Sequence, residues 1–442
     1  MIQGLKHPLS QFLLIGMLIR LILAPFTTMP YDMSFWAGVI NGFNMGEGLY
    51  ESEYYWYSPT WGYILSFMTP LINILGIDVQ GFIVPDENDH VISYVYAAIT
   101  DPKFNLVIKT PLIISDILVS LVIYKLAYNF TNDERKSAIS AGIWLLCPLA
   151  IWNSAVQGQF DTLSILGMMS AFYFLIQRSY FLAGFMIAFG TVTKLFPGLF
   201  VPLMIGFVIS KEIGRTDCLN GISKMAGGFA ICTLLILLPV TLMGNFEESF
   251  YFLTDRIDSY SDSSASDFFR PLWGNIFTIF PIIIILILTL TIRLAVKKDD
   301  NTDRRFMILA TATLLFIFAW PNIPPYSQYA LLMMPMFAIL LNLDFNMKLP
   351  IILTSILFTT SVLLLTGPSI IYPLSMGTGI IPPESVESAI DSWYSYSGYL
   401  YYLIERLKFI PALLGLLILA IKNRKEIESI FVHWRNNDAE TS

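Results

Sequence analysis

Long apolar stretches recur from one end of the 442-residue chain to the other, and short charged segments separate them. Only 13% of the residues are Asp, Glu, Lys or Arg, against about 25% in a typical soluble domain. A chain of this kind hides its apolar surface in a bilayer, where helices satisfy their own backbone groups. We therefore expect an all-α polytopic membrane protein. The stretches that fit crossings are 9–25, 105–130, 138–155, 159–176, 180–195, 197–210, 222–243, 275–296, 306–320, 328–343, 349–366 and 405–421.

The loops between these stretches alternate in the sign of their charge. Because Lys and Arg accumulate in cytoplasmic loops, the basic loops are expected inside and the acidic loops outside or in a lumen. This alternation predicts a cytoplasmic amino terminus and about 12 crossings. The basic positions lie at 135–136, 178, 211–224, 297–305, 348 and 422–425, and the acidic clusters lie at 47–53, 86–89, 247–267 and 384–391.

One further apolar segment, residues 58–76, does not fit as a crossing, because counting it would invert every later loop. We expect it to be an interfacial or re-entrant helix, weakened in its middle by Pro70. A second interfacial helix is expected at 33–46, where apolar residues recur at helical spacing on one face. Both helices would belong to one large external loop, residues 26–104.

Polar side chains interrupt the apolar pattern mainly at the expected outer ends of the crossings. An ionisable residue inside a crossing, such as Arg20, generally faces a cavity or a partner. These residues come from distant parts of the chain, and the predicted sidedness brings them to one side of the membrane. The candidate site residues are Asp32 as the acid, with Lys194, Arg20, Gln159, Asp161, Arg256, Arg270, Gln328 and Tyr329 as substrate-binding residues.

Each candidate also has a purely structural explanation. Asp32 is able to start the helix expected at 33–46, and Asp161 in the first turn of a helix favours the helix dipole. Lys194 is able to reach the lipid headgroups. The three histidines and three cysteines have no metal-ligand spacing, and no nucleotide-binding glycine motif is present. We expect no metal, no cofactor and no nucleic-acid partner.

Three segments in order resemble the GT-C superfamily of integral-membrane glycosyltransferases. The first is Asp32 with the following "FW" and "GLYESEYYWYSPTWGYIL", the second runs from "QGQFD" to "TKLFPG", and the third is "YSQYALLMMP". The nearest likeness is to archaeal members and to eukaryotic mannosyltransferases that use dolichyl-phosphate mannose. Within that group, the enzymes known as the first glycosylphosphatidylinositol mannosyltransferase carry Asp-x-Asp, whereas this chain reads Asp32-Met33-Ser34. That departure argues against close membership and against a metal held by such a pair.

The resemblance implies a GT-C fold with two interfacial helices in the first external loop. It divides the chain into a catalytic module at 1–243 and a variable transmembrane half at 244–442, whose external loops are 244–274 and 367–404. It also implies that Asp32 is the catalytic carboxylate, which takes the proton of the acceptor hydroxyl. The implied membrane is the archaeal plasma membrane with the site facing outward, or otherwise an endoplasmic-reticulum-type membrane.

The implied activity is transfer of a hexose with inversion at the anomeric carbon. The sugar is expected to be mannose, because the resembling family members transfer mannose. The donor would be a dolichyl or polyprenyl phosphate sugar, and the acceptor a lipid-linked glycan or a glycolipid. Two alternatives stay open at this point. One is a lipid or sugar transporter, although the internal repeats common in transporters are not evident. The other is a GT-C transferase that acts on protein hydroxyls.

Overall fold

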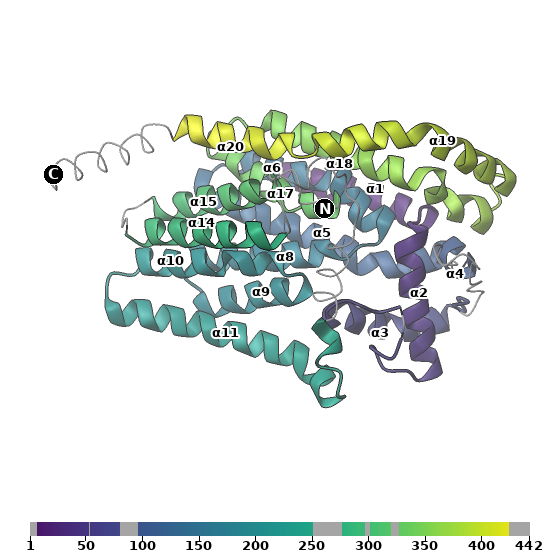
Figure 1. The fold of residues 1–442 in the computed structure, drawn as a ribbon, viewed down its shortest axis with the longest axis horizontal. Coiled ribbons are helices and arrows are strands. Elements are labelled where there is room, and N and C mark those ends of the chain that lie inside the picture. Colours follow the sequence, from purple (N-terminus) through teal and green to yellow (C-terminus); the bar gives the residue numbers. More distant parts are fainter. Residues whose placement is uncertain are drawn as a thin grey trace.

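The computed structural model describes residues 7–52, 54–79, 96–250, 276–296, 301–319 and 327–423. Within these ranges every regular element is a helix. Most of the helices run side by side along the longest axis of the molecule, and they form a bundle (Figure 1). The all-helical fold expected from the apolar pattern is therefore confirmed.

Each expected crossing corresponds to one helix or to a short series of helices. The third is broken into three pieces, and the sixth and the tenth are each broken into two. The bounds are α1 Pro8–Phe26, α5 Pro102–Thr131, α6 Glu134–Leu145, α7 Pro148–Ile151, η2 Trp152–Gln157, α8 Asp161–Ile176, α9 Tyr180–Thr193, η3 Phe196–Phe200, α10 Val201–Lys211, α11 Arg215–Leu242, α14 Ile276–Val296, α15 Thr302–Phe318, α16 Ser327–Ala330, α17 Met333–Asn342, α18 Lys348–Thr366 and α20 Ile410–Lys422.

The helix lengths identify fewer membrane crossings than the charge pattern predicts. Four of the described helices are long and apolar enough to span a bilayer, or five if the bent pair 134–157 counts as one span. Helices such as α8, α9 and α17 are shorter than the roughly 20 residues that a crossing needs. The structure thus supports an integral membrane protein, and the total of 12 crossings stays a prediction.

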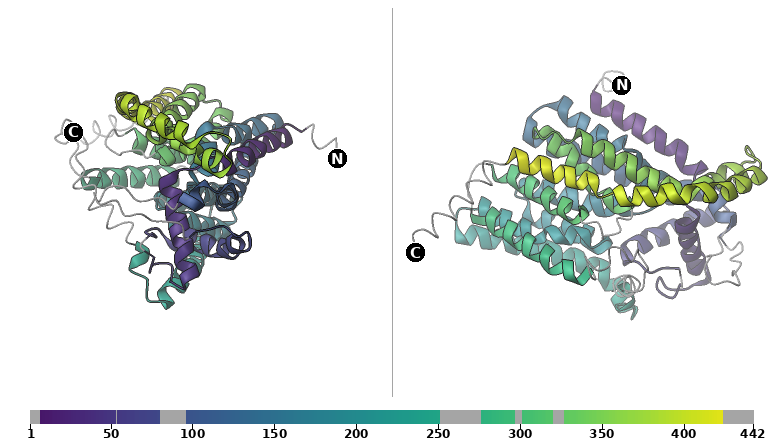
Figure 2. Two further views of the ribbon diagram at one scale, coloured as in Figure 1. Left: turned by 90° about the vertical axis from the view of Figure 1, so that its right-hand side faces the viewer. Right: turned by 45° about the horizontal axis from the view of Figure 1, so that its top comes forward.

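Two helices of the segment predicted to be the first external loop lie outside the parallel bundle. The helix α2 spans Pro30–Met45 and runs across the ends of the bundle helices, while α3 spans Pro59–Ile74 (Figures 1 and 2). A proline at the first helical position starts each one, and Gly46, with φ of 86°, ends α2. The amides of Asn44 and Asn73 exchange two hydrogen bonds of 3.2 and 2.8 Å between the two helices.

The loops predicted to be cytoplasmic meet at one end of the bundle. Lys211 Nζ donates to Asp303 Oδ1 at 2.8 Å, and Arg304 donates to the carbonyl of Leu343 at 2.9 Å. These contacts join three of the loops that the charge pattern assigns to the same side. The loops therefore lie together at one end of the bundle, and their cytoplasmic side stays a prediction.

The carboxy-terminal half is more helical than expected. The predicted external loop 367–404 contains η5 Gly367–Ile371, η6 Pro373–Gly377 and most of the long helix α19, Pro383–Leu407. In Figure 1, α19 continues almost in line with α20. Its amino-terminal turns are polar and exposed, which explains why hydropathy did not identify it as a helix.

The buried apolar residues form two main clusters. The larger one lies between the helices of the bundle and joins α5, α6, α8 and α10 to α15 and α17 of the carboxy-terminal half. The second lies between α2, α3 and the start of α5, and it includes Trp36, Trp61 and Phe160. This second cluster supports the residues around Asp32.

Candidate active site

Asp32 lies in the first turn of α2, directly after the α1–α2 junction. A carboxylate in this position is stabilised by the positive end of the helix dipole. The side chain does not cap the helix: the residue before α2 is Met29, which makes no side-chain cap hydrogen bond. Asp32 is only 7% exposed, so its carboxylate faces the interior of the protein.

Two glutamine amides hold the two carboxylate oxygens of Asp32. Gln157 Nε2 donates to Oδ2 at 3.0 Å, and Gln159 Nε2 donates to Oδ1 at 2.6 Å. We call this arrangement the glutamine clamp. Hydrogen bonds to both oxygens fix the orientation of the carboxylate and stabilise its ionised form.

The clamp is built by a break in the third crossing. Residues Trp152–Gln157 form a π-helix, and Gly158 ends it with φ of 73°. The indole of Trp36 donates to the Gly158 carbonyl at 3.0 Å, which ties this turn to α2. A Cβ atom at Gly158 would lie 2.5 Å from Met33 Sδ. Glycine is therefore required here both for the backbone angle and for the close approach of α2.

An ion pair lies beside the clamp. Lys194 ends α9 and Asp161 begins α8, and Lys194 Nζ donates to Asp161 Oδ1 at 2.7 Å. The same ammonium lies 4.7 Å from the ring centre of Phe160 and 5.5 Å from that of Tyr329. Asn153, on the π-helix, donates to the second oxygen of Asp161 at 3.4 Å.

The carboxy-terminal half also reaches the site. Gln157 Nε2 lies 3.3 Å from Gln328 Oε1, so this amide donates to both Asp32 and α16. The structure therefore brings together six of the nine predicted site residues. They are Asp32, Gln159, Asp161, Lys194, Gln328 and Tyr329.

Burial raises the pKa of Asp32 from 3.8 to about 6. The hydrogen bonds from Gln157 and Gln159 and the nearby charge of Lys194 oppose this rise, whereas the charge of Asp161 adds to it. The result is a carboxylate that is mostly ionised at neutral pH but basic enough to accept a proton. Such a pKa is typical of a general base.

Arg20 was predicted to bind substrate, but its side chain lies inside the bundle and contacts Asp116 instead. It is fully buried in the bundle, and its Nε donates to Asp116 Oδ2 at 2.7 Å. Its Nη1 donates to the carbonyl of Leu145 at 2.7 Å. Ser154, one turn before Gln157, donates to the same Asp116 oxygen at 2.5 Å. Arg20 thus contacts the framework under the clamp rather than the clamp itself.

The remaining predicted residues, Arg256 and Arg270, lie outside the described residues. The sequence analysis missed Lys109 and Asp116, two buried charged residues within the apolar stretch 105–130. Their signal was present, because an ionisable residue in the middle of such a stretch requires a partner. Among the described residues, no group of three or more His, Cys, Asp or Glu is placed to hold a metal ion.

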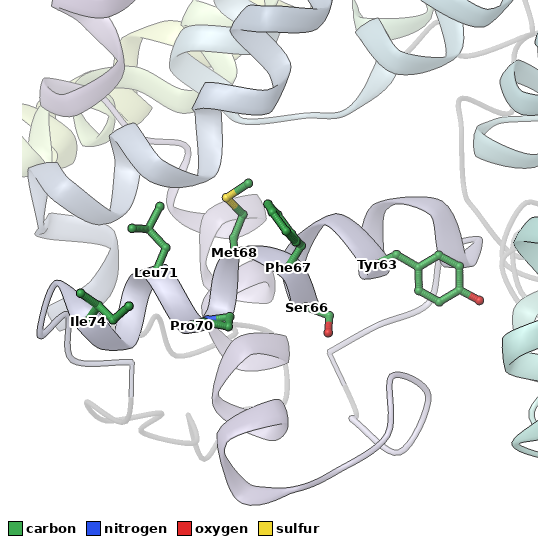
Figure 3. Close-up of a pocket in the computed structure, with 7 residues that line it drawn as sticks. All are labelled: Tyr63, Ser66, Phe67, Met68, Pro70, Leu71 and Ile74. Atoms are coloured by element: carbon green, nitrogen blue, oxygen red, sulfur yellow. The ribbon is translucent and has the colours of Figure 1, made fainter.

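A separate apolar hollow of about 740 Å³ lies along α3 (Figure 3). Its lining includes Phe67, Leu71 and Ile74, of which Phe67 and Ile74 are 78% and 81% exposed. Asp32 is not part of the lining. The hollow therefore offers an apolar surface to lipid on the same helix that packs under the site.

The described residues thus form a bundle of apolar helices with a buried carboxylate, a cation and amide donors gathered at one site. Two comparisons with known proteins indicate the class of protein. The profile of glycosyltransferase family 87 matches residues 109–320. Over 116 residues the chain is 27% identical to GPI mannosyltransferase 1 of Candida albicans, an alignment that covers 26% of this chain and 29% of that protein. These matches are consistent with a GT-C-type membrane glycosyltransferase, and they confirm the resemblance drawn from the motifs.

The family match covers part of the site. It includes the glutamine clamp and the Lys194–Asp161 pair, and it ends before Gln328. Asp32 lies on the amino-terminal side of the matched residues. The family match therefore gives no support for a role of Asp32, and that role is argued from the contacts of Asp32 alone.

Proposed function

We propose that the protein is an inverting glycosyltransferase that moves a hexose, mannose by preference, from a dolichyl or polyprenyl phosphate donor to a lipid-linked glycan or glycolipid. The observation that carries the proposal is the glutamine clamp on Asp32. A carboxylate that is buried, oriented at both oxygens and raised in pKa to about 6 has the properties of a base for an acceptor hydroxyl.

In the proposed reaction, the Asp32 carboxylate removes the proton of an acceptor hydroxyl as that oxygen attacks the anomeric carbon of the donor sugar. The bond between the anomeric carbon and the phosphate oxygen breaks, and the phosphate leaves with the electron pair. Attack from the side opposite to the leaving group inverts the anomeric configuration. Asp32 is left protonated and returns the proton to water.

Lys194 would stabilise the charge of the leaving phosphate. Its ammonium is already oriented by Asp161 at 2.7 Å and by the faces of Phe160 and Tyr329. An ammonium that is oriented before the reaction does not have to reorganise when the transition state forms. Gln328 and Tyr329 would supply further polar contacts from the carboxy-terminal half.

The donor is a lipid, and α3 provides a surface for it. The hollow along Phe67, Leu71 and Ile74 would hold the isoprenoid chain while the phosphate enters the site. Lys211, at the end of α10, and Arg304, at the start of α15, lie where the predicted cytoplasmic loops contact one another. In Figure 1, α2, which carries Asp32, lies toward the opposite end of the bundle. By the positive-inside rule the site would face outward, in an archaeal plasma membrane or, in a eukaryote, the lumen of the endoplasmic reticulum.

The proposal is tested with purified protein in sealed proteoliposomes, given dolichyl phosphate carrying radiolabelled mannose and a set of acceptors. The acceptors are lipid-linked oligosaccharides, glycolipids and hydroxyl-containing peptides. The expected result is label on a lipid acceptor, with an anomeric configuration opposite to that of the donor by NMR. Label on the peptides would reject the acceptor class. Movement of the intact donor across the membrane without transfer would reject the enzyme in favour of a transporter.

A further inference from the structure

Lys109 is a buried charged residue that has no part in the proposed reaction. It lies on α5 and is 0% exposed. Its ammonium donates to the carbonyl of Ala24 at 3.1 Å, to the carbonyl of Thr27 at 2.5 Å and to Asn105 Oδ1 at 3.2 Å. These three bonds use all three of its N–H groups, and all three acceptors are uncharged. Burying a lysine in this way is costly, so a specific reason for its presence is expected.

The two backbone acceptors lie at the end of α1. The last carbonyls of a helix have no partner within the helix, and they form the negative end of its dipole. Lys109 satisfies two of them, at Ala24 and at Thr27, the residue that ends α1. The chain leaves Thr27 in an extended conformation and begins α2 at Pro30, two residues before Asp32. Lys109 therefore fixes the starting point of the segment that carries the proposed base.

The stem of the same side chain lies against the clamp. A Cβ at Gly158 would lie 3.6 Å from Lys109 Cε and 3.7 Å from its Cγ, and 2.5 Å from Met33 Sδ. Gly158 separates the two glutamines that hold Asp32. One lysine thus contacts both sides of the arrangement: the α1–α2 junction through its ammonium and the clamp turn through its methylene groups.

We propose that Lys109 is a positioning residue that keeps Asp32 and the glutamine clamp in register. This inference goes beyond the proposed function but rests on it where catalysis is the readout. Without the ammonium, the carbonyls of Ala24 and Thr27 lose their partner, and the junction is free to shift. A displacement of about 1 Å at a catalytic group lowers the rate by as much as 10²-fold. The donor contacts at Lys194 would not change.

The test compares Lys109→Met with Lys125→Met in nanodiscs. Lys125 lies on the same helix, is exposed and contacts the ring of Tyr173, away from the site. For Lys109→Met we expect kcat to fall by at least about tenfold, with the KM for dolichyl phosphate mannose within a factor of about two. The acid limb of the rate profile should move to higher pH, because a weakened clamp no longer stabilises the ionised carboxylate. Lys125→Met should match the wild type.

A second readout does not depend on activity. Hydrogen exchange followed by mass spectrometry should show faster exchange in Lys109→Met for peptides covering 28–33 and 156–160, and unchanged exchange in α8 and α9. If Lys109→Met does not fold, Lys109→Gln, which keeps an N–H donor, is measured instead. Unchanged kcat, pH profile and exchange would overturn the inference. A wild-type protein that transfers no sugar would overturn the proposed function, and the exchange data would still decide the role of Lys109.

Discussion

Gln159 Nε2 lies 2.6 Å from Asp32 Oδ1, although 127 residues separate the two along the chain. Asp32 lies in the first turn of a helix that crosses the end of the bundle, whereas Gln159 follows a break in a bundle helix. The contact therefore joins α2 to the bundle at the carboxylate of Asp32. Its consequences are measurable in the pH dependence of the reaction.

Activity of the wild-type protein should fall on the acid side with an apparent pKa of about 6, the pKa of Asp32. The sign follows from the role of the group: as a base it acts only when ionised, so protonation below that pH removes activity. The measurement is kcat/KM for transfer as a function of pH. A profile that stays flat down to pH 4.5 would show that no group of this pKa acts as the base.

Replacement of Gln159 should move this acid limb upward. In Gln159→Leu one hydrogen bond to the ionised form is lost, while the burial that raises the pKa persists. We expect an apparent pKa above about 6 and a lower rate at pH 6.5. Gln177→Leu, at the opposite end of α8 and exposed, is the matched control. Identical profiles for the two variants would mean that the clamp does not act on the base.

Lys194→Ala should mainly raise the KM for the lipid donor. The substitution removes the cation expected next to the donor phosphate and leaves Asp161 without its partner. The control is Lys211→Ala, which breaks a similar pair with Asp303, 2.8 Å apart, at the other end of the bundle. Steady-state kinetics with varied donor should show an increase of at least about tenfold for Lys194→Ala only, as expected for a charge-assisted contact. Equal effects of both substitutions would point to a general loss of folding.

Arg20→Met should reduce stability without changing the KM for the donor. The variant leaves the Asp116 carboxylate buried and unpaired, a change that typically costs about 3–5 kcal/mol. The double variant Arg20→Met/Asp116→Leu removes both charges and should recover part of the loss. Thermal unfolding in detergent measures the stability. A normal melting temperature together with a raised KM for the donor would indicate that Arg20 binds substrate, as the sequence analysis predicted.

Much of the site could be predicted because its residues share a simple property. Asp32, Asp161, Lys194 and Gln328 all lie where an apolar stretch ends on the same predicted side, and the charge of the loops was enough to assign that side. The contacts between them could not be predicted. The orientation of the clamp depends on the π-helix at Trp152–Gln157 and on the left-handed Gly158, and neither has a distinctive local sequence pattern.

The errors have equally specific causes. Arg20 was assigned to the site because its partner was not recognised: Asp116 lies 96 residues away in an apolar stretch. The helix α19 was taken as a loop because its first turns are polar. The count of 12 crossings came from the apolar stretches together with the loop charges. It stays a prediction, because short helices such as α9 do not by themselves establish a span.

The central claim is that the Asp32 carboxylate is the base for sugar transfer, and Asp32→Asn tests it most directly. The amide keeps the size of the side chain but cannot accept the proton. The control is Asp78→Asn, which changes an exposed carboxylate in the same segment between α1 and α5. In the transfer assay with radiolabelled dolichyl phosphate mannose, we expect Asp32→Asn to lose about 10²–10⁴-fold in rate and Asp78→Asn to keep wild-type activity. Transfer by folded Asp32→Asn protein at the wild-type rate would contradict the account.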